Sequence, residues 1–187
     1  VFNERINTSS YMLFAHSSGG WIALEAVGRG VLPIPDAMIL ASSGDSVFKY
    51  LKEARKLLYQ IGAWEYFSVW LGSQNPFYKQ AYKKFMDSHV VRHPAQDIHK
   101  KARRRASYSA YHNLWGENEL FPDGELKDFT VSRLDWVAKT NLLTTHGKYD
   151  HVPAVFSKNI RSLNPTHGLH TFNDSAHYPH LEQPKKY

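Results

Sequence analysis

The chain has 187 residues, of which 42% are apolar and 14% aromatic, with no cysteine and a formal net charge of +6. This composition excludes a disordered chain, and the absence of cysteine excludes disulfides and thiolate metal sites. The length suits one domain with a sizeable core. The longest apolar runs, such as residues 37–41, are far below the ~18 residues that span a bilayer, and no leader pattern opens the chain. We therefore expect a soluble protein, and a cytoplasmic one, although the composition leaves the compartment open.

The first elements along the chain predict a strand, a tight turn and a helix. Residues 11–14 form a short apolar run, Gly19 and Gly20 follow, and residues 21–27 carry apolar side chains at helical spacing. Residues 37–41 read as a second buried strand. Two strands that flank a helix form a βαβ unit, so the sheet should be parallel and the fold class α/β.

The pattern then changes to helices that are rich in aromatic and basic residues, which we interpret as an inserted helical lid over residues 45–136. The stretches that carry this pattern are residues 51–58, 64–71, 77–89 and 95–112. Strand signals return at residues 141–145 and 169–172, separated by a helical stretch at 152–163. We expect a hydrolase core at 1–44 with the nucleophile elbow, the lid at 45–136, and the rest of the core at 137–187 with the acid and histidine loops.

Two other patterns suggest different functions. The basic run at residues 99–105 is typical of a nucleic-acid surface, but a solvated face of a basic helix explains it equally well and no nucleic-acid module accompanies it. His89 and His93 have the spacing of a metal-binding helix, but Val90 replaces the glutamate of H-E-x-x-H and Pro94 should end the helix. We expect no metal or other cofactor, no nucleic-acid partner and no membrane partner; the oligomeric state is not indicated.

The segment Ala15-His16-Ser17-Ser18-Gly19 has the form of a nucleophile elbow, with alanine in place of the first glycine of G-x-S-x-G. The elbow lifts a serine hydroxyl off the end of a strand, and this turn needs small neighbours. Ser17 is the predicted nucleophile. The backbone N–H of Ser18, at the start of the next helix, should face a developing oxyanion.

The other two members of a Ser-Asp-His set follow in the expected order. Asp150 comes after the strand at 141–145, and His177 comes after the strand at 169–172. The carboxyl ends of parallel strands share one edge of the sheet, which lets the three side chains converge. We predict that His177 is the general base and that Asp150 orients it.

Several stretches resemble the proline iminopeptidases, which are serine aminopeptidases of the α/β-hydrolase fold. They are the elbow at 11–20, the segments 85–92, 114–120 and 124–129 of the lid, the acid loop at 142–150 and the histidine loop at 175–184. At the positions of Ala15 and Ser18 the family usually has glycine and an aromatic residue. The resemblance implies a serine peptidase or amidase with an α/β-hydrolase fold, acting on a small peptide, amide or ester.

The resemblance also implies how the substrate is held. A family glutamate that matches Glu119, and a second carboxylate directly after the catalytic aspartate, bind the free α-ammonium group; here the second position is His151. A neutral imidazole supplies no negative charge, so recognition of a free amine should be weaker or replaced by another polar contact. Rings such as those of Trp115, Tyr111 or Trp64 should enclose a small apolar or prolyl group.

The family's H-G-G-P-G loop, which gives the second oxyanion N–H, and several strands before the elbow are not in this sequence. We therefore expect that the chain is a piece of a longer protein or a truncated relative, and that the 187 residues alone fold poorly and are inactive. Three functions follow as hypotheses: an aminopeptidase of proline iminopeptidase type, an esterase or lactonase acting on an uncharged substrate, and a binding protein that keeps the fold without catalysis.

Overall fold

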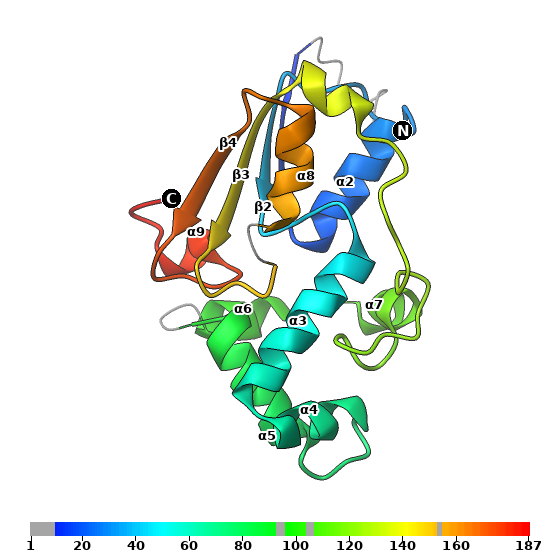
Figure 1. Ribbon diagram of the computed structural model, residues 1–187, viewed down its shortest axis with the longest axis vertical. Helices are drawn as coiled ribbons and strands as arrows, with labels where there is room; N and C mark the ends of the chain where they lie inside the picture. Colours follow the sequence, from blue (N-terminus) through cyan, green and yellow to red (C-terminus); the bar gives the residue numbers. More distant parts are fainter. Residues whose placement is uncertain (1–9, 93–95, 104–106, 153–154) are drawn as a thin grey trace.

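Four parallel strands form the sheet of this protein, whose computed structural model describes residues 10–92, 96–103, 107–152 and 155–187. The strands are β1 (Met12–His16), β2 (Ala37–Ala41), β3 (Asn141–Gly147) and β4 (Gly168–Phe172), and they lie in the order β1-β2-β3-β4 (Figure 1). All three pairings are parallel. The predicted α/β class with a parallel sheet is confirmed.

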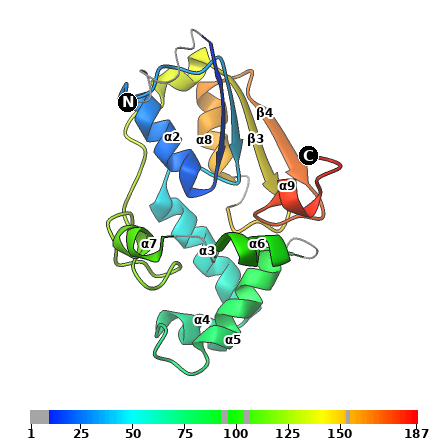
Figure 2. The same ribbon diagram turned by 180° about the vertical axis from the view of Figure 1, so that it is seen from behind.

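Some helices lie next to the sheet, and the helices between β2 and β3 in the chain form a separate layer beyond one end of it (Figure 1). Next to the sheet lie α2 (Ser18–Gly28), the 3₁₀ turn η2 (Asp135–Lys139), α8 (Val155–Leu163) and α9 (Pro179–Glu182). The helical insertion between β2 and β3 contains α3 (Val47–Ile61), α4 (Ala63–Trp70), α5 (Tyr78–Phe85), the π-helical turn η1 (Met86–Val90), α6 (Gln96–Arg103) and α7 (Tyr108–Trp115). Figures 1 and 2 show the sheet at one end of the long axis and α4 and α5 at the other.

Most predicted elements exist, with shifted ends. The first strand runs two residues further than expected, to His16, and the helix after it begins at Ser18. The predicted helix at 77–89 changes at Phe85 into the π-helical turn η1, and the predicted helix at 95–112 is two helices, α6 and α7. Helical spacing alone cannot separate one long helix from two short ones. The division of the chain into core and lid domains stays a prediction.

The core beside the sheet explains the small residues that follow Ser17. Buried residues of α2, including Leu24 and Val27, pack with Met38 and Leu40 of β2. The helix approaches β2 so closely that a Cβ at Gly20 would lie 2.2 Å from the Ser43 hydroxyl oxygen and 2.7 Å from Leu40 Cδ1. Glycine at this position is therefore required by the packing of α2 against the sheet.

A second core holds the helical insertion together and joins it to the sheet. Helix α3 begins at the N-cap Ser46, whose hydroxyl accepts a hydrogen bond from the N–H of Lys49 at 3.4 Å. Its buried residues lie at helical spacing on one face: Val47, Tyr50, Leu51, Ala54 and Leu58. The same cluster includes Trp21 of α2 and Trp115 of α7. The insertion therefore packs against the carboxyl edge of the sheet, where the functional side chains lie.

Candidate active site

Ser17 occupies a sharp turn between β1 and α2. Its backbone has φ 54° and ψ −129°, in a region that a non-glycine residue adopts at a cost of about 1–3 kcal/mol. Its N–H donates to the carbonyl oxygen of Ala41 at 3.0 Å, which ties the turn to the end of β2. Ala15, two residues before Ser17, is buried. The local geometry is that of a nucleophile elbow, in which the serine hydroxyl is lifted from the strand end.

The structure brings the three predicted side chains into one hydrogen-bonded chain. His177 Nε2 lies 2.8 Å from Ser17 Oγ, and His177 Nδ1 lies 2.8 Å from Asp150 Oδ1. The N–H of Val152 also donates to Asp150 Oδ1, at 2.8 Å. Because a carboxylate only accepts, Nδ1 carries the proton, and Nε2 is left with a lone pair for the Ser17 hydroxyl. The arrangement can therefore take a proton from the serine, as in Ser-His-Asp hydrolases.

Burial decides the charge state of this group. Asp150 and His177 are each 3% exposed. Desolvation lowers the pKa of His177 below its ordinary value of 6.5, and the neighbouring imidazoles of His99 and His180 lower it further. Desolvation likewise raises the pKa of Asp150. At neutral pH the imidazole of His177 is therefore uncharged, which is the state that accepts a proton.

The first residues of α2 supply a donor beside Ser17. Ser17 is the N-cap of this 11-residue helix, and Ser18 is its first residue. The N–H groups of a helix's first turn have no acceptor within the helix, and the helix dipole makes that end positive. The N–H of Ser18 thus belongs to a set of donors that can stabilise negative charge close to Ser17 Oγ.

A cavity of about 260 Å³ opens in front of Ser17. Trp115, Tyr111 and Glu119 of the helical insertion line it. Tyr82 donates to Glu119 Oε2 at 2.8 Å, and burial together with the negative charge of Glu119 raises the pKa of Tyr82, which therefore stays a donor. The expectation that Trp64 encloses the substrate is wrong. Its ring is 63% exposed and contacts Phe77, because α4 lies at the far end of the insertion.

His151 lines the same cavity and lies against His177. Its ring centroid lies 4.2 Å from that of His177, and its Nδ1 lies 3.0 Å from the carbonyl oxygen of His89. A carbonyl only accepts, so Nδ1 of His151 carries the proton and Nε2 has the lone pair. Burial and, to a smaller extent, the proximity of His177 lower the pKa of His151 to about 4. His151 therefore offers the cavity a neutral ring.

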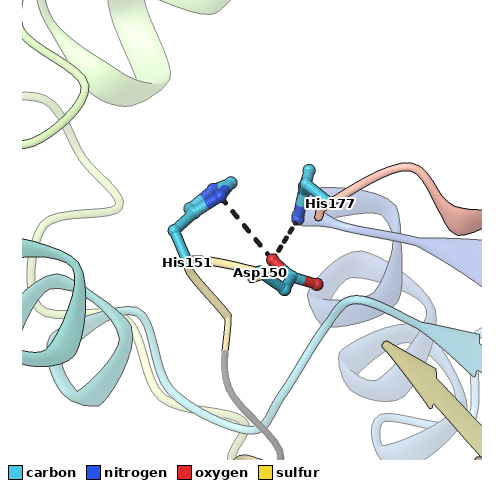
Figure 3. A group of neighbouring side chains, drawn as sticks. All are labelled: Asp150, His151 and His177. Atoms are coloured by element: carbon cyan, nitrogen blue, oxygen red, sulfur yellow. Dashed lines mark hydrogen bonds and ion pairs between the residues drawn. The ribbon is translucent and has the colours of Figure 1, made fainter. Parts of the chain in front are cut away.

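Asp150, His151 and His177 bring three potential metal-ligand atoms within 4.8 Å of one another (Figure 3). Both Nδ1 atoms point toward Asp150 Oδ1, at 2.8 Å for His177 and 3.6 Å for His151. His177 Nδ1 donates to Asp150, and His151 Nδ1 donates to the carbonyl of His89. These hydrogen bonds fit an imidazole that a carboxylate orients. His93, the second residue of the other histidine pair, lies outside the described residues.

Sequence reasoning missed the residues that hold the loops of His151 and His177 against the insertion. The carbonyl of His89 accepts from the N–H of His151 at 3.3 Å, and the carbonyl of Val90 accepts from the N–H of His177 at 3.1 Å. These carbonyls belong to the last two residues of η1, and the last carbonyls of a helix have no donor within the helix, so they can accept from tertiary partners. The pairing of these backbone groups has no signature in the hydrophobic pattern.

Glu182 performs a similar role from α9. Its Oε2 accepts from the N–H of Ala176 at 2.8 Å and its Oε1 from the N–H of Arg92 at 3.4 Å. His16, inside the elbow, donates through Nε2 to the carbonyl oxygen of His177 at 2.8 Å. His16 directly precedes Ser17, and Glu182 lies in the histidine loop that follows His177. This closeness in sequence is the signal that could have marked them.

With this geometry established, the sequence matches the alpha/beta hydrolase family over residues 7–187, and the chain belongs to that family. Among curated relatives, it is 26% identical to a proline iminopeptidase of Levilactobacillus brevis over 191 residues, which covers 94% of this chain and 61% of the relative. It is 32% identical to a proline iminopeptidase of Heyndrickxia coagulans over 78 residues, or 41% of this chain and 27% of the relative.

Solved structures share the fold. The crystal structure of VinJ superimposes with a TM-score of 0.82 at 21% identity, covering 99% of this chain and 65% of that one. The proline iminopeptidase of Mycobacterium smegmatis gives a TM-score of 0.80 at 23% identity, covering 99% and 64%. The chain thus spans less than two thirds of the length of these relatives. The resemblance to proline iminopeptidases seen in the sequence is confirmed.

Proposed function

We propose that this protein is a serine hydrolase that cleaves an amide or ester through an acyl-enzyme. The observation that carries the proposal is the pair of 2.8 Å hydrogen bonds that links Ser17 to His177 and His177 to Asp150. Ser17 Oγ attacks the substrate carbonyl carbon while its proton moves to His177 Nε2. The carbonyl oxygen becomes an oxyanion, which the N–H of Ser18 stabilises.

The same proton completes the first half of the reaction. The imidazolium of His177, held by Asp150, gives its proton to the leaving nitrogen or oxygen, and the bond between that atom and the acyl carbon breaks. Water then attacks the acyl carbon while His177 Nε2 takes one of its protons. The bond between that carbon and Ser17 Oγ breaks, His177 returns the proton to Oγ, and the acid leaves. Burial of Asp150 and His177 supports these roles, because a dry site strengthens the attraction between the imidazolium and the carboxylate.

For the substrate, we favour a small peptide or amide with a free amino group, as for an aminopeptidase of proline iminopeptidase type. Glu119 lies in the cavity as an acceptor already oriented by Tyr82. Trp115 and Tyr111 provide ring surface for a small apolar or prolyl residue. The curated relatives named above bear the name of this activity.

The second candidate is an esterase or lactonase, and His151 favours it. Its neutral ring brings no charge toward an ammonium group, whereas its lone pair can accept from a hydroxyl or an amide N–H. A substrate without a positive charge would then bind as well as one with a free amine.

Two measurements on the intact protein test these proposals. A fluorophosphonate probe should label the wild type and fail to label Ser17→Ala; labelling of the variant would remove Ser17 as nucleophile, and an unlabelled wild type would favour a binding protein without catalysis. Turnover of prolyl and alanyl arylamides, each with a free or a blocked amine, then separates the substrate classes. A preference for free amines supports the aminopeptidase, and equal turnover supports the esterase.

A further inference from the structure

Helix α4 exposes a continuous apolar face to solvent. Trp64, Phe67 and Trp70 lie at helical spacing on it, and Leu71 follows as its C-cap. Phe77, in the segment that follows, packs its ring on Trp64 with centroids 5.5 Å apart. Their exposed fractions lie between 48% and 63%. We call these five residues the aromatic tip. A monomer rarely exposes so many large apolar side chains together unless the patch binds something.

The aromatic tip lies far from the cavity in front of Ser17. Figures 1 and 2 show α4 at the end of the long axis opposite the sheet. None of its five residues lines that cavity. The tip is therefore a separate surface, and whatever it binds is not the substrate held beside the nucleophile.

Positive charge accompanies this surface. Residues 45–87, which hold α3, α4, α5 and the acidic partners of their lysines, contain seven Lys or Arg against two Asp and two Glu. Helix α5 exposes Lys79, Lys83 and Lys84. Lys83 forms an ion pair with Asp87, and Lys84 forms one with Glu65 of α4, which places the C-terminal end of α5 beside the aromatic tip. Exposed indole and phenyl rings flanked by lysines are the composition of helices that lie in a membrane interface.

We propose that the aromatic tip docks on the surface of an anionic lipid membrane. The rings of the tip enter the boundary between headgroups and acyl chains, and the lysines of α5 face the anionic headgroups. A second copy of the chain fits less well, because a symmetric contact would bring two equally basic surfaces together. Among the described residues, no helix is long and apolar enough to cross a bilayer, so the contact is peripheral.

This proposal replaces the expectation that the protein has no membrane partner. That expectation came from the absence of a long apolar run, which bears on crossing a membrane and not on lying against one. The proposal is also independent of the hydrolase chemistry. A failure of either one leaves the other standing.

The intrinsic fluorescence of the protein gives a direct test. Of the five tryptophans in the chain, Trp64 and Trp70 are exposed, while Trp21, Trp115 and Trp136 are buried. Vesicles of phosphatidylcholine with about one third phosphatidylserine should bind the intact protein, shift the emission of the exposed indoles to the blue, and shield them from acrylamide. Vesicles of phosphatidylcholine alone should bind more weakly, and added salt should weaken binding through screening.

Variants then locate the contact by co-sedimentation with the same vesicles. Trp64→Ser combined with Trp70→Ser should weaken binding at least about tenfold, given the apolar area that leaves water. Lys79→Glu combined with Lys83→Glu should weaken binding to anionic vesicles and abolish the advantage over neutral ones. Phe48→Ser is the matched control, since Phe48 is exposed at the other end of the insertion, at the start of α3, and its loss should change nothing.

The outcomes are separable. Failure of the wild type to bind anionic vesicles, or equal binding by the double tryptophan variant, overturns the proposal. Dimerisation that depends on the tip, without vesicle binding, assigns the surface to a second copy instead. Because these side chains are exposed, circular dichroism and the turnover of a soluble ester should be the same in every variant. Quenching of the wild-type tryptophans by brominated lipid provides evidence that needs no variant.

Discussion

Replacing Gly147 by alanine should damage catalysis more than stability. Gly147 ends β3, where the chain passes directly beneath the loop that carries His177. An added Cβ would lie 2.2 Å from the carbonyl oxygens of both Ser175 and Ala176. Both contacts are to backbone, so no side chain can rotate away. The histidine loop would have to move by about 1.2 Å to reach an ordinary contact of 3.4 Å.

That displacement is large for the reacting groups. Ala176 precedes His177, whose two nitrogens each hold a partner at 2.8 Å. A misplacement of about 1 Å in a catalytic group can reduce turnover by a factor of about 10². Strain of this kind in a packed interior typically costs about 1–3 kcal/mol of the free energy of unfolding. We therefore expect kcat/KM for an activated ester to fall about a hundredfold while the protein remains folded.

Gly168→Ala provides the matched control in the same strand pair. Gly168 begins β4, opposite Leu143, and its added Cβ would meet the Cδ1 of Leu143 at 3.0 Å. Leu143 is partly exposed and its side chain can give way, so we expect turnover within about threefold of the wild type. Thermal melting of both variants separates stability from activity. Turnover by Gly147→Ala within threefold of the wild type would refute the steric argument.

Four more predictions follow from the site. Ser17→Ala should reduce turnover more than about 10³-fold with an unchanged melting temperature, and activity within tenfold of the wild type would remove Ser17 as nucleophile. Glu119→Gln should cost free-amine substrates about 1.5–3 kcal/mol and spare blocked ones, whereas equal losses would show a structural role. In Glu182→Gln, the side-chain NH₂ group would face one of the two backbone N–H groups that the carboxylate now accepts from. We therefore expect the free energy of unfolding, measured with denaturant, to fall by about 1–3 kcal/mol; no loss would contradict the anchoring role of Glu182. Because His177 must be neutral to act and burial lowers its pKa, kcat/KM should be constant above pH 6.5 and fall about tenfold per pH unit only below the lowered pKa; an acid limb centred above pH 7 would contradict this.

Free-amine recognition has a further test at the position beside Asp150. His151→Glu would place a carboxylate where the neutral ring now lies in the cavity. If Glu119 binds an ammonium group, the added charge should increase the preference for free over blocked amines. An unchanged preference would count against the aminopeptidase proposal and in favour of the esterase. His151→Gln is the neutral control.

Local chemistry along the chain was enough to predict the elements that carry the site. The apolar runs that became β1 to β4 are typical of strands, and the small residues around Ser17 are typical of a tight turn. Both patterns depend on residues that are neighbours in the sequence. Ser17, Asp150 and His177 follow β1, β3 and β4, and this placement was enough to predict their convergence, because parallel strands share a carboxyl edge. These features depend on residues close in sequence or on the topology that such residues imply.

Other features were decided only by tertiary packing. The sequence marks Trp64 and Trp115 equally as lid aromatics. In the structure Trp64 is exposed at the aromatic tip, whereas Trp115 is buried beside Trp21. The difference arises because the orientation of α4 relative to α7 depends on contacts distant in sequence. The anchoring of His151 and His177 to carbonyls of η1 likewise pairs backbone groups about 60 and 90 residues apart. Backbone groups are the same in every residue, so no pattern of side chains could have predicted which of them meet.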